Sequence, residues 1–340
     1  MKKIRVAING AGRIGRAFYK VASKRKEIEI VAINDLADIK NIAYLLKYDT
    51  AYGKSGLDIK VGNGELEIDG KKVVYISEKD PQKLPWGNLK IDIVVESTGL
   101  FTSYEKSKAH IQAGAKRVVI SAPAKDVAGS QQAATVLLGI NEDKIKTCEI
   151  TSNASCTTNA ASPLLAILDE AIGIEKAILN TVHGYTASQG IVDGPNKKDF
   201  KEGRAAAQNI VPTSTGAAIA VSKALTQFEG KFDGISMRVP IVAGSIVDVT
   251  FIAKKNTSVE EINNLLKKAA GDKRLQKVFS VTEDQIVSSD IVGSPYASIA
   301  DLGLTKVIDG NLVKVCAWYD NEMGYTYSLV EHVIEAGKLI

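Results

Sequence analysis

The 340-residue chain is poor in the residues that mark a disulfide framework, a metal site or a membrane segment. Its 3 cysteines show neither disulfide nor metal-ligand spacing: Cys148, Cys156 and Cys316. No apolar run approaches the roughly 20 residues that span a bilayer. The first apolar run, residues 4–9, is too short for a signal peptide. We therefore expect no metal, no membrane contact and a reducing, cytoplasmic setting in which a free thiol survives.

Charge of one sign is also scarce, because 43 Lys and Arg against 39 Asp and Glu leave a net charge of +4. This balance gives no reason to expect a nucleic-acid partner, although a mildly basic surface suits small anionic molecules. The length predicts two domains. No internal repeat, low-complexity tract or linker rich in proline and glycine separates them, so we expect them to be tightly joined.

The first part of the chain has the pattern of a dinucleotide-binding fold. Residues 4–9 and 29–34 read as buried strands, and a helical pattern begins at residue 16 between them. The turn before the helix carries the motif G-x-G-x-x-G, with its glycines at Gly10, Gly12 and Gly15. Such glycines allow a tight turn, the approach of a pyrophosphate to the helix N-terminus, and packing of the helix on the strand.

Asp35 indicates which dinucleotide to expect. It follows the second strand and lies 20 positions after Gly15, where an acid that binds a ribose hydroxyl is expected. A carboxylate there favours a free 2′-hydroxyl and repels a 2′-phosphate, so the pattern predicts NAD rather than NADP. The alternative is a glycine turn followed by an unrelated acid.

Strand and helix patterns alternate up to about residue 150. Solid Val/Ile runs at 91–95 and 118–120, with a helical pattern at 104–113 between them, are typical of a parallel sheet covered on both faces. The expected fold class is therefore α/β, with a Rossmann-type doubly wound parallel sheet. Ligands of such sheets bind beyond the carboxyl ends of the strands. Three residues at those ends are candidates for the cofactor site or ordinary loop residues: Thr98, Gly99 and Ser121.

The second half of the chain changes character. A helix is expected at 259–270 with Ser258 as its cap, and a polar stretch at 184–205 is expected to be a functional loop. Strands are expected at 177–183, 234–239, 244–253, 285–289 and 312–318. This mixture predicts an α+β catalytic domain with a mainly antiparallel sheet. We expect an NAD-binding domain of residues 1–154 joined by a C-terminal helical segment, 321–340, and a catalytic domain of residues 155–320.

Cys156 is the expected centre of the chemistry. It lies in the polar segment Ser152-Asn153-Ala154-Ser155-Cys156-Thr157-Thr158-Asn159, just before an apolar helical pattern. A cysteine in the first turn of a helix lies among unpaired N–H groups at the positive end of the dipole, which lowers its pKa. These groups and the neighbouring hydroxyls suit an oxyanion or a phosphate. The alternative is a buried cysteine that simply begins a helix, but hydroxyl and amide side chains are poor core material.

A nucleophilic cysteine needs a base, and the chain offers His110, His183 and His332. The first lies on a helix of the nucleotide half and the last on the terminal helix. His183 ends a strand of the second domain, at the start of the polar loop. We therefore predict that His183 pairs with Cys156, lowers its pKa when charged, and carries protons.

Three further places suit an anion. Thr186 follows His183 closely, Thr215 and Gly216 precede an apolar helix, and Arg238 ends a strand where its guanidinium could clamp a phosphate. Each alone could be a helix cap or a surface group. Together they suggest a substrate that carries phosphate.

The sequence resembles the phosphorylating glyceraldehyde-3-phosphate dehydrogenase family in its NAD-dependent, glycolytic form. The resemblance runs nearly end to end, and segment 152–159 is close to diagnostic of the family. The other segments that carry it are 9–16, 34–36, 96–102, 121–123, 203–218 and 318–322.

The resemblance implies that Cys156 attacks the aldehyde of D-glyceraldehyde 3-phosphate to give a thiohemiacetal, with His183 as base. Hydride transfer to NAD⁺ then leaves a thioester, and inorganic phosphate releases 1,3-bisphosphoglycerate in glycolysis and gluconeogenesis. It implies substrate or phosphate contacts at Ser155, Cys156, Thr157, Thr186, Thr215, Gly216 and Arg238. It implies NAD contacts at Arg13, Ile14, Asp35, Ser121 and Asn321, and a homotetramer.

Two departures from the family pattern bear on ligand contacts. Lys79 replaces a frequent arginine near the adenine, and Lys201 lies where many members carry an arginine that contacts phosphate. Which residue of segment 201–203 replaces that arginine stays open, and Lys201 is one candidate, as a less well oriented point charge. The nearest rival enzyme is an erythrose-4-phosphate dehydrogenase of the same architecture, in which water attacks the thioester. A rival of another class is a catalytically silent nucleotide-binding redox sensor, against which the intact Cys156 and His183 argue.

Overall fold

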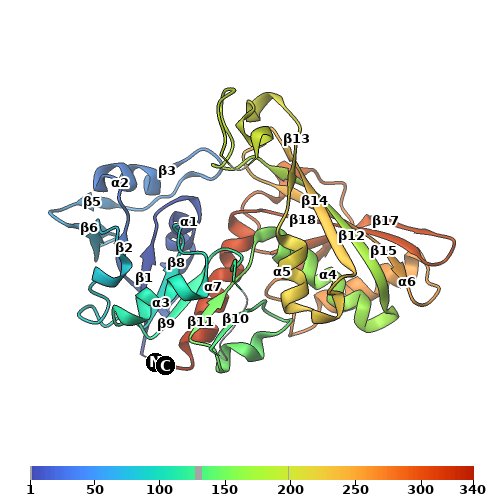
Figure 1. Cartoon of the computed structure of the whole chain (residues 1–340), viewed down its shortest axis with the longest axis horizontal. Helices are drawn as coiled ribbons and strands as arrows, with labels where there is room; N and C mark the ends of the chain where they lie inside the picture. The colour runs from blue at the N-terminus through green and yellow to red at the C-terminus, as the bar shows by residue number, and fades with distance from the viewer. Residues whose placement is uncertain (1, 127–131, 198) are drawn as a thin grey trace. The chain divides into compact units, whose positions relative to one another are not determined.

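The computed structural model describes residues 2–126, 132–197 and 199–340 (Figure 1). The chain divides into two compact units. The first consists of Met1–Val136, Asn141–Ala154 and Leu329–Ile340, and the second of Leu137–Ile140 and Ser155–Ser328. The last helix, α7 (Met323–Gly337), therefore contributes residues to both units.

The first unit is built on a largely parallel sheet with the strand order β10-β11-β9-β8-β1-β2-β7-β6-β5. Only the β7-β6-β5 edge is antiparallel among the described strands. The strands are β1 (Ile4–Asn9), β2 (Ile28–Asn34), β5 (Ile59–Val61), β6 (Glu65–Ile68), β7 (Lys71–Ile76), β8 (Ile93–Glu96), β9 (Arg117–Ile120), β10 (Ala133–Thr135) and β11 (Ile150–Ser152). A small hairpin, β3 (Tyr48–Asp49) and β4 (Gly53–Lys54), lies outside this sheet.

The helices of the first unit follow the predicted alternation with strands. They are α1 (Arg13–Ala22), α2 (Ile39–Lys47) and α3 (Tyr104–Gln112). Every residue of β8 is buried, as expected for a strand covered on both faces. Because β1 lies between β2 and β8, the strand order reverses there, and ligands of such sheets bind beyond the carboxyl ends at that point. The predicted Rossmann-type sheet is confirmed.

The second unit contains a mainly antiparallel sheet with the order β13-β14-β12-β15-β18-β17-β16. The β12–β14 and β16–β17 pairs are parallel. Along β15 buried and half-buried residues alternate strictly, so one face of the sheet is covered. The strands are β12 (Ile174–Gly184), β13 (Val211–Ser214), β14 (Phe232–Val239), β15 (Ser245–Ala253), β16 (Phe279–Thr282), β17 (Ser298–Ile308) and β18 (Leu312–Tyr319). Its helices are α4 (Cys156–Ile172), α5 (Ala217–Ala224) and α6 (Val259–Ala270).

One expected strand of the second unit is wrong. Residues 285–289 do not form a strand, and a 3-10 turn begins at Ser288 instead. The Asp290 carboxylate accepts the N–H of Val287 at 2.7 Å, and such a local bond competes with strand pairing. The expected helix at 259–270 is confirmed with its cap, because the Ser258 hydroxyl accepts the N–H of Glu261 at 3.1 Å.

Two features are absent among the described residues. No helix in these parts of the chain is long and apolar enough to cross a membrane. The same residues contain no group of three or more His, Cys, Asp or Glu that could hold a metal ion.

Candidate active site

Cys156 is the first residue of α4, as the sequence predicts. The hydroxyl of Ser155 caps this helix and accepts the N–H of Thr158 at 3.1 Å. Ala154, just before the cap, has a φ of 54°, in the left-handed region that few residues other than glycine adopt. Such strained positions persist where the surrounding structure fixes them, often at active sites. The Cys156 side chain is half-buried at the helix N-terminus.

His183 lies beside the thiol. Its Nε2 is 3.4 Å from Sγ of Cys156. The ring is placed by the sheet, because β12 and β14 pair in parallel in a register that sets His183 opposite Arg238. The structure thus brings together the side chains predicted as nucleophile and base, and adds a cation predicted to bind phosphate.

The other ring nitrogen of His183 has two close polar neighbours. Nδ1 lies 2.6 Å from the carbonyl oxygen of Gly184 and 2.6 Å from Nη1 of Arg238. A neutral imidazole nitrogen either donates or accepts, so Nδ1 satisfies only one of these neighbours at a time. With its proton on Nδ1 the ring donates to Gly184 and leaves Nε2 able to accept the thiol proton. With its proton on Nε2 the ring accepts from Arg238 instead. A base role for His183 requires the first tautomer.

The electrostatics around the free thiol differ from the expectation. Burial raises the pKa of Cys156, while the Arg238 charge and the backbone N–H groups of Thr157 and Cys156 act in the opposite direction. Burial, followed by the charge of Arg238, lowers the pKa of His183 to about 3. The expected lowering of the thiol pKa by the helix N-terminus is therefore outweighed by desolvation. The structure therefore favours a neutral imidazole in the absence of substrate.

Tyr319 supports the thiol segment, and the sequence showed it only as part of a longer motif. Its hydroxyl lies 2.9 Å from the Thr157 hydroxyl and 2.7 Å from the Thr181 hydroxyl. Thr181 donates its proton to the carbonyl of Ile246 at 3.1 Å. Because each hydroxyl has one proton, Tyr319 donates to Thr181 and Thr157 donates to Tyr319. These hydrogen bonds fix the side chain of Thr157, the residue after Cys156.

The other candidate anion-binding groups occupy a loop, a helix start and a strand end. Thr186 contacts the Ser188 hydroxyl at 3.1 Å in the loop after β12. Thr215 accepts the N–H of Ala217 at 3.2 Å before α5, and Gly216 is exposed at the start of that helix. Nε of Arg238 has no hydrogen-bond partner among the described residues. The guanidinium therefore retains a donor for an anion.

Lys201, one candidate to replace a phosphate-contacting arginine, is an exposed residue of the 3-10 turn Phe200–Gly203. Its Nζ lies 3.7 Å from a carboxylate oxygen of Asp199, and its side chain is 58% exposed. An exposed ion pair of this length is weak. Asp199 therefore does little to prevent Lys201 from meeting an anion.

A separate cleft of about 290 Å³ lies in the first unit at the carboxyl ends of β1, β2 and β8. Its lining includes five residues predicted to bind the cofactor: Gly10, Gly12, Asp35, Lys79 and Thr98. Gly10 has a φ of 97°, and a Cβ there would meet the backbone of Thr98 at 2.7 Å. A Cβ on Gly12 would meet open space, and no side chain caps α1 at that residue. The N-terminus of α1 thus has room for a phosphate at Gly12.

The carboxylate of Asp35 is held in the cleft by two backbone N–H groups, one of them in the glycine turn. One carboxylate oxygen accepts the N–H of Ala11 at 2.7 Å, and the other accepts the N–H of Ala37 at 2.9 Å. These bonds hold a negative charge in the cleft, where a ribose hydroxyl could also donate. The residues present therefore fit NAD, with Gly10 and Gly12 toward its phosphates and Asp35 toward its ribose.

The remaining predicted cofactor residues do not line this cleft. Arg13 instead pairs with Asp49 at 2.9 Å, and the Ser121 hydroxyl donates to the carbonyl of Glu96 at 3.0 Å. Asn321 lies in the second unit, where its side-chain oxygen Oδ1 accepts the N–H of Gly244 at 3.1 Å. The others outside the lining are Ile14, Gly15 and Gly99.

Two family models match the chain. The model "Glyceraldehyde 3-phosphate dehydrogenase, NAD binding domain" matches residues 4–104, and "Glyceraldehyde 3-phosphate dehydrogenase, C-terminal domain" matches residues 155–321. Three similar proteins carry the name glyceraldehyde-3-phosphate dehydrogenase. The protein from Streptomyces coelicolor is 46% identical over 338 residues, covering 98% of this chain and 99% of that protein. Those from Clostridium pasteurianum and Mycobacterium avium are 47% and 48% identical, covering 96% and 98% of this chain and 96% and 99% of their own lengths.

Proposed function

Because this chain belongs to the glyceraldehyde-3-phosphate dehydrogenase family, and is an enzyme of that kind with NAD as cofactor, we propose that it oxidises D-glyceraldehyde 3-phosphate in the presence of inorganic phosphate. The product is 1,3-bisphosphoglycerate, and the setting is cytoplasmic glycolysis and gluconeogenesis. The observation that supports this chemistry most directly is the 3.4 Å approach of Cys156 Sγ to His183 Nε2 at the start of α4.

In the first step Cys156 is the nucleophile. Sγ attacks the aldehyde carbon while His183 Nε2 takes the thiol proton, and the product is a thiohemiacetal. The N–H groups in the first turn of α4 stabilise the negative charge that develops on the carbonyl oxygen. NAD, which Gly10, Gly12 and Asp35 would hold in the cleft, would supply the hydride acceptor for oxidation of this adduct to a thioester.

In the second step inorganic phosphate attacks the thioester carbon, and the C–S bond breaks. The leaving thiolate of Cys156 can regain its proton from His183. Arg238 is suited to one of the two phosphates, because its Nε has no partner among the described residues and a guanidinium matches phosphate geometry. We assign the remaining phosphate contacts to Ser155, Thr157, Thr186, Thr215 and Gly216.

The deciding assay is NADH formation from NAD⁺ and glyceraldehyde 3-phosphate, with and without inorganic phosphate. Sustained turnover that depends on phosphate is expected, because acyl transfer to phosphate frees the thiol. Sustained turnover without phosphate would mean that water attacks the thioester, as in an erythrose-4-phosphate dehydrogenase. NAD binding without turnover of glyceraldehyde 3-phosphate or of erythrose 4-phosphate would instead favour a nucleotide-binding redox sensor.

Replacement of Asp35 by asparagine is expected to reduce the preference for NAD over NADP by about tenfold or more. The variant keeps the shape of the side chain but removes a charge that repels a 2′-phosphate, and about 1.4 kcal/mol corresponds to tenfold. The measurement is kcat/KM for each cofactor. Asp38→Asn is a matched control, because Asp38 caps α2 and does not line the cleft. Unaltered selectivity in Asp35→Asn would exclude this role.

We also propose that the protein is a homotetramer. Large apolar side chains are exposed in the loop after β12, among them Ile191 at 86% and Phe200 at 85%. Ile178 on β12 and Ile235 on β14 are exposed as well. Exposed apolar groups of this extent favour burial against other subunits. Light scattering should give four times the chain mass, and a monomer would contradict the assembly.

A further inference from the structure

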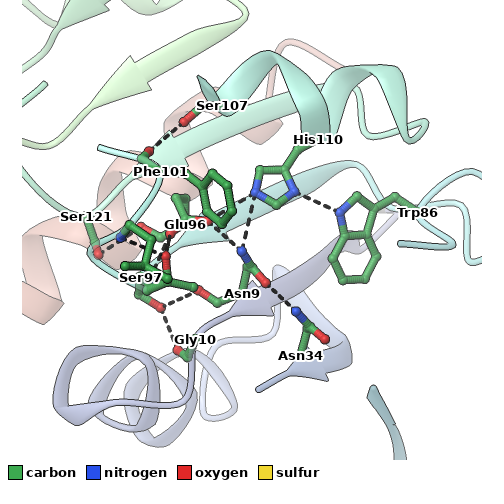
Figure 2. Close-up of polar contacts among 12 residues, drawn as sticks. Asn9, Gly10, Asn34, Trp86, Glu96, Ser97, Phe101, Ser107, His110 and Ser121 are labelled. Atoms are coloured by element: carbon green, nitrogen blue, oxygen red, sulfur yellow. Dashed lines mark hydrogen bonds and ion pairs between the residues drawn. The ribbon is translucent and has the colours of Figure 1, made fainter. Parts of the chain in front are cut away.

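Three neighbouring strands of the first unit end in polar side chains that form one hydrogen-bonded row. Asn34 on β2, Asn9 on β1 and Glu96 on β8 are register partners at the carboxyl ends of their strands. The Asn34 amide donates to Oδ1 of Asn9 at 2.7 Å, and the Asn9 amide donates to Oε2 of Glu96 at 2.6 Å (Figure 2). All three residues are at least 95% buried. The row therefore ends on a carboxylate inside the unit.

His110 on α3 reaches the same carboxylate from the other side. The indole N–H of Trp86 can only donate, and it lies 3.1 Å from Nδ1 of His110. Nδ1 therefore accepts, and the ring proton is on Nε2, which lies 3.1 Å from Oε2 of Glu96. The contact between Asn9 and this Nε2 at 3.5 Å joins two donors in this tautomer and is no hydrogen bond. His110 is thus neutral and donates to Glu96 (Figure 2).

The second carboxylate oxygen of Glu96 holds the turn that follows β8. Oε1 accepts the backbone N–H of Thr98 at 2.8 Å and also the Thr98 hydroxyl proton. Glu96 thus receives four donors, which matches the roughly four acceptor sites of a carboxylate. The Thr98 oxygen accepts the N–H of Leu100 at 3.0 Å. One buried carboxylate therefore sets the shape of this turn.

The same row supports much of the lining of the cofactor cleft. Asn9, Asn34, Thr98 and Leu100 all line it. Asn34 also exchanges two hydrogen bonds of 2.9 Å with the backbone of Glu78, another lining residue. The buried side chains of Asn34, Asn9 and Glu96 thereby join lining residues from separate segments of the chain.

We propose that Glu96 is a positioning residue for NAD, an inference that rests on the proposed function. Its carboxylate holds the Thr98–Leu100 turn in the binding conformation before the cofactor arrives. Ordering the turn in advance removes a conformational cost from the binding step. The row of Asn34 and Asn9 and the Nε2 proton of His110 hold the carboxylate in place.

Glutamine at position 96 tests this arrangement because it has the same shape but one amide group in place of an oxygen. If the glutamine NH₂ faces Thr98, two donors face each other, and the hydrogen bond from the backbone N–H of Thr98 is lost. If its NH₂ faces His110, the ring must move its proton to Nδ1 and lose the bond from Trp86. The first orientation releases the turn directly, and the second dismantles the support of the side chain that holds it.

The experiment measures the Kd of NAD by titration calorimetry in wild type and in Glu96→Gln. We expect Glu96→Gln to weaken NAD binding by about tenfold, the effect of losing a hydrogen bond to a charged group, and to raise KM for NAD more than it lowers kcat. Asp92→Asn is the matched control. Asp92 precedes β8 at its opposite end, is 3% exposed, and accepts from Arg5 at 3.0 Å and Lys116 at 2.7 Å. It is expected to alter the melting temperature without changing the Kd of NAD.

An unchanged Kd in Glu96→Gln, or an equal loss in Asp92→Asn, would overturn the positioning role. If Glu96→Gln does not fold, hydrogen exchange of wild type decides: the hydrogen-bonded amides of Thr98 and Leu100 should exchange slowly without NAD, and fast exchange there would overturn the proposal. A wild-type protein that fails to bind NAD would overturn the proposed function as well. Normal NAD binding by both wild type and Glu96→Gln would overturn the positioning role alone.

Discussion

Cys156→Ser is expected to lower kcat/KM for NADH formation by about 10⁴-fold or more while NAD still binds. The serine hydroxyl fits the place of Sγ at the start of α4, but it is much less acidic than a thiol. The same His183 imidazole that can accept a thiol proton cannot generate a useful fraction of alkoxide from a serine hydroxyl. The thiohemiacetal therefore does not form at a useful rate. The measurements are steady-state kinetics and calorimetric titration with NAD.

Cys316→Ser is the matched control for this variant. Cys316 is a buried free cysteine on β18, and burial raises its pKa to about 11. It should remain a thiol and react slowly, so its replacement should preserve turnover. Iodoacetamide labelling followed by mass spectrometry should mark Cys156 before Cys316. Turnover retained in Cys156→Ser would remove Cys156 as the nucleophile.

The first unit could be predicted from sequence because its patterns are local. A buried strand, the glycine turn, a helix and the strand that ends at Asp35 follow one another within about 30 residues. Position 10 also requires glycine, because its φ of 97° is one that other residues rarely adopt and because a Cβ there would meet the backbone of Thr98 at 2.7 Å. These local requirements agree with one another, which is what makes a sequence readable.

The second unit was harder because its sheet is assembled from distant segments. The strand β17 was not anticipated: only its first residues are continuously buried, and exposed residues and a glycine interrupt the rest. The expected strand at 285–289 contained an apolar pair, Ile286 and Val287, but the Asp290 carboxylate binds the backbone there. Apolar character alone does not separate a strand from a capped turn.

The candidate site shows the same limit. A helix start at Cys156 and a histidine at a strand end could be inferred from neighbouring residues. The position of Arg238 opposite His183 depends on the parallel pairing of β12 and β14, which no local pattern reveals. Tyr319 lies 162 positions from Thr157, and burial, not the helix dipole, sets the direction of the thiol pKa. Long-range pairing and desolvation appear only in three dimensions.

His183→Asn is expected to slow acylation by about 10²–10⁴-fold, the usual contribution of a positioned base. The asparagine amide can still donate to the Gly184 carbonyl in place of Nδ1, but no group remains at Nε2 to take the thiol proton. The rate should then follow simple ionisation of Cys156, whose pKa burial raises, so activity should increase steeply with alkaline pH. Stopped-flow measurement of the first NADH turnover over a range of pH isolates this step.

His183→Gln separates a base from a hydrogen-bond partner. Glutamine reaches toward the Nε2 position, 3.4 Å from Sγ in the wild type, and can donate to a thiolate, but it cannot accept a proton and carry it away. If His183 acts as the base, the glutamine variant should be as slow as the asparagine variant, with the same alkaline rise. Recovery of the wild-type rate and pH profile by glutamine would show that His183 only orients the thiol.

The pH profile of the wild type is a further test. Because wild-type His183 stays neutral down to about pH 3, the acylation rate of the wild-type enzyme should show no loss near pH 6.5 from protonation of this ring. Such a loss would contradict a neutral base held beside Arg238.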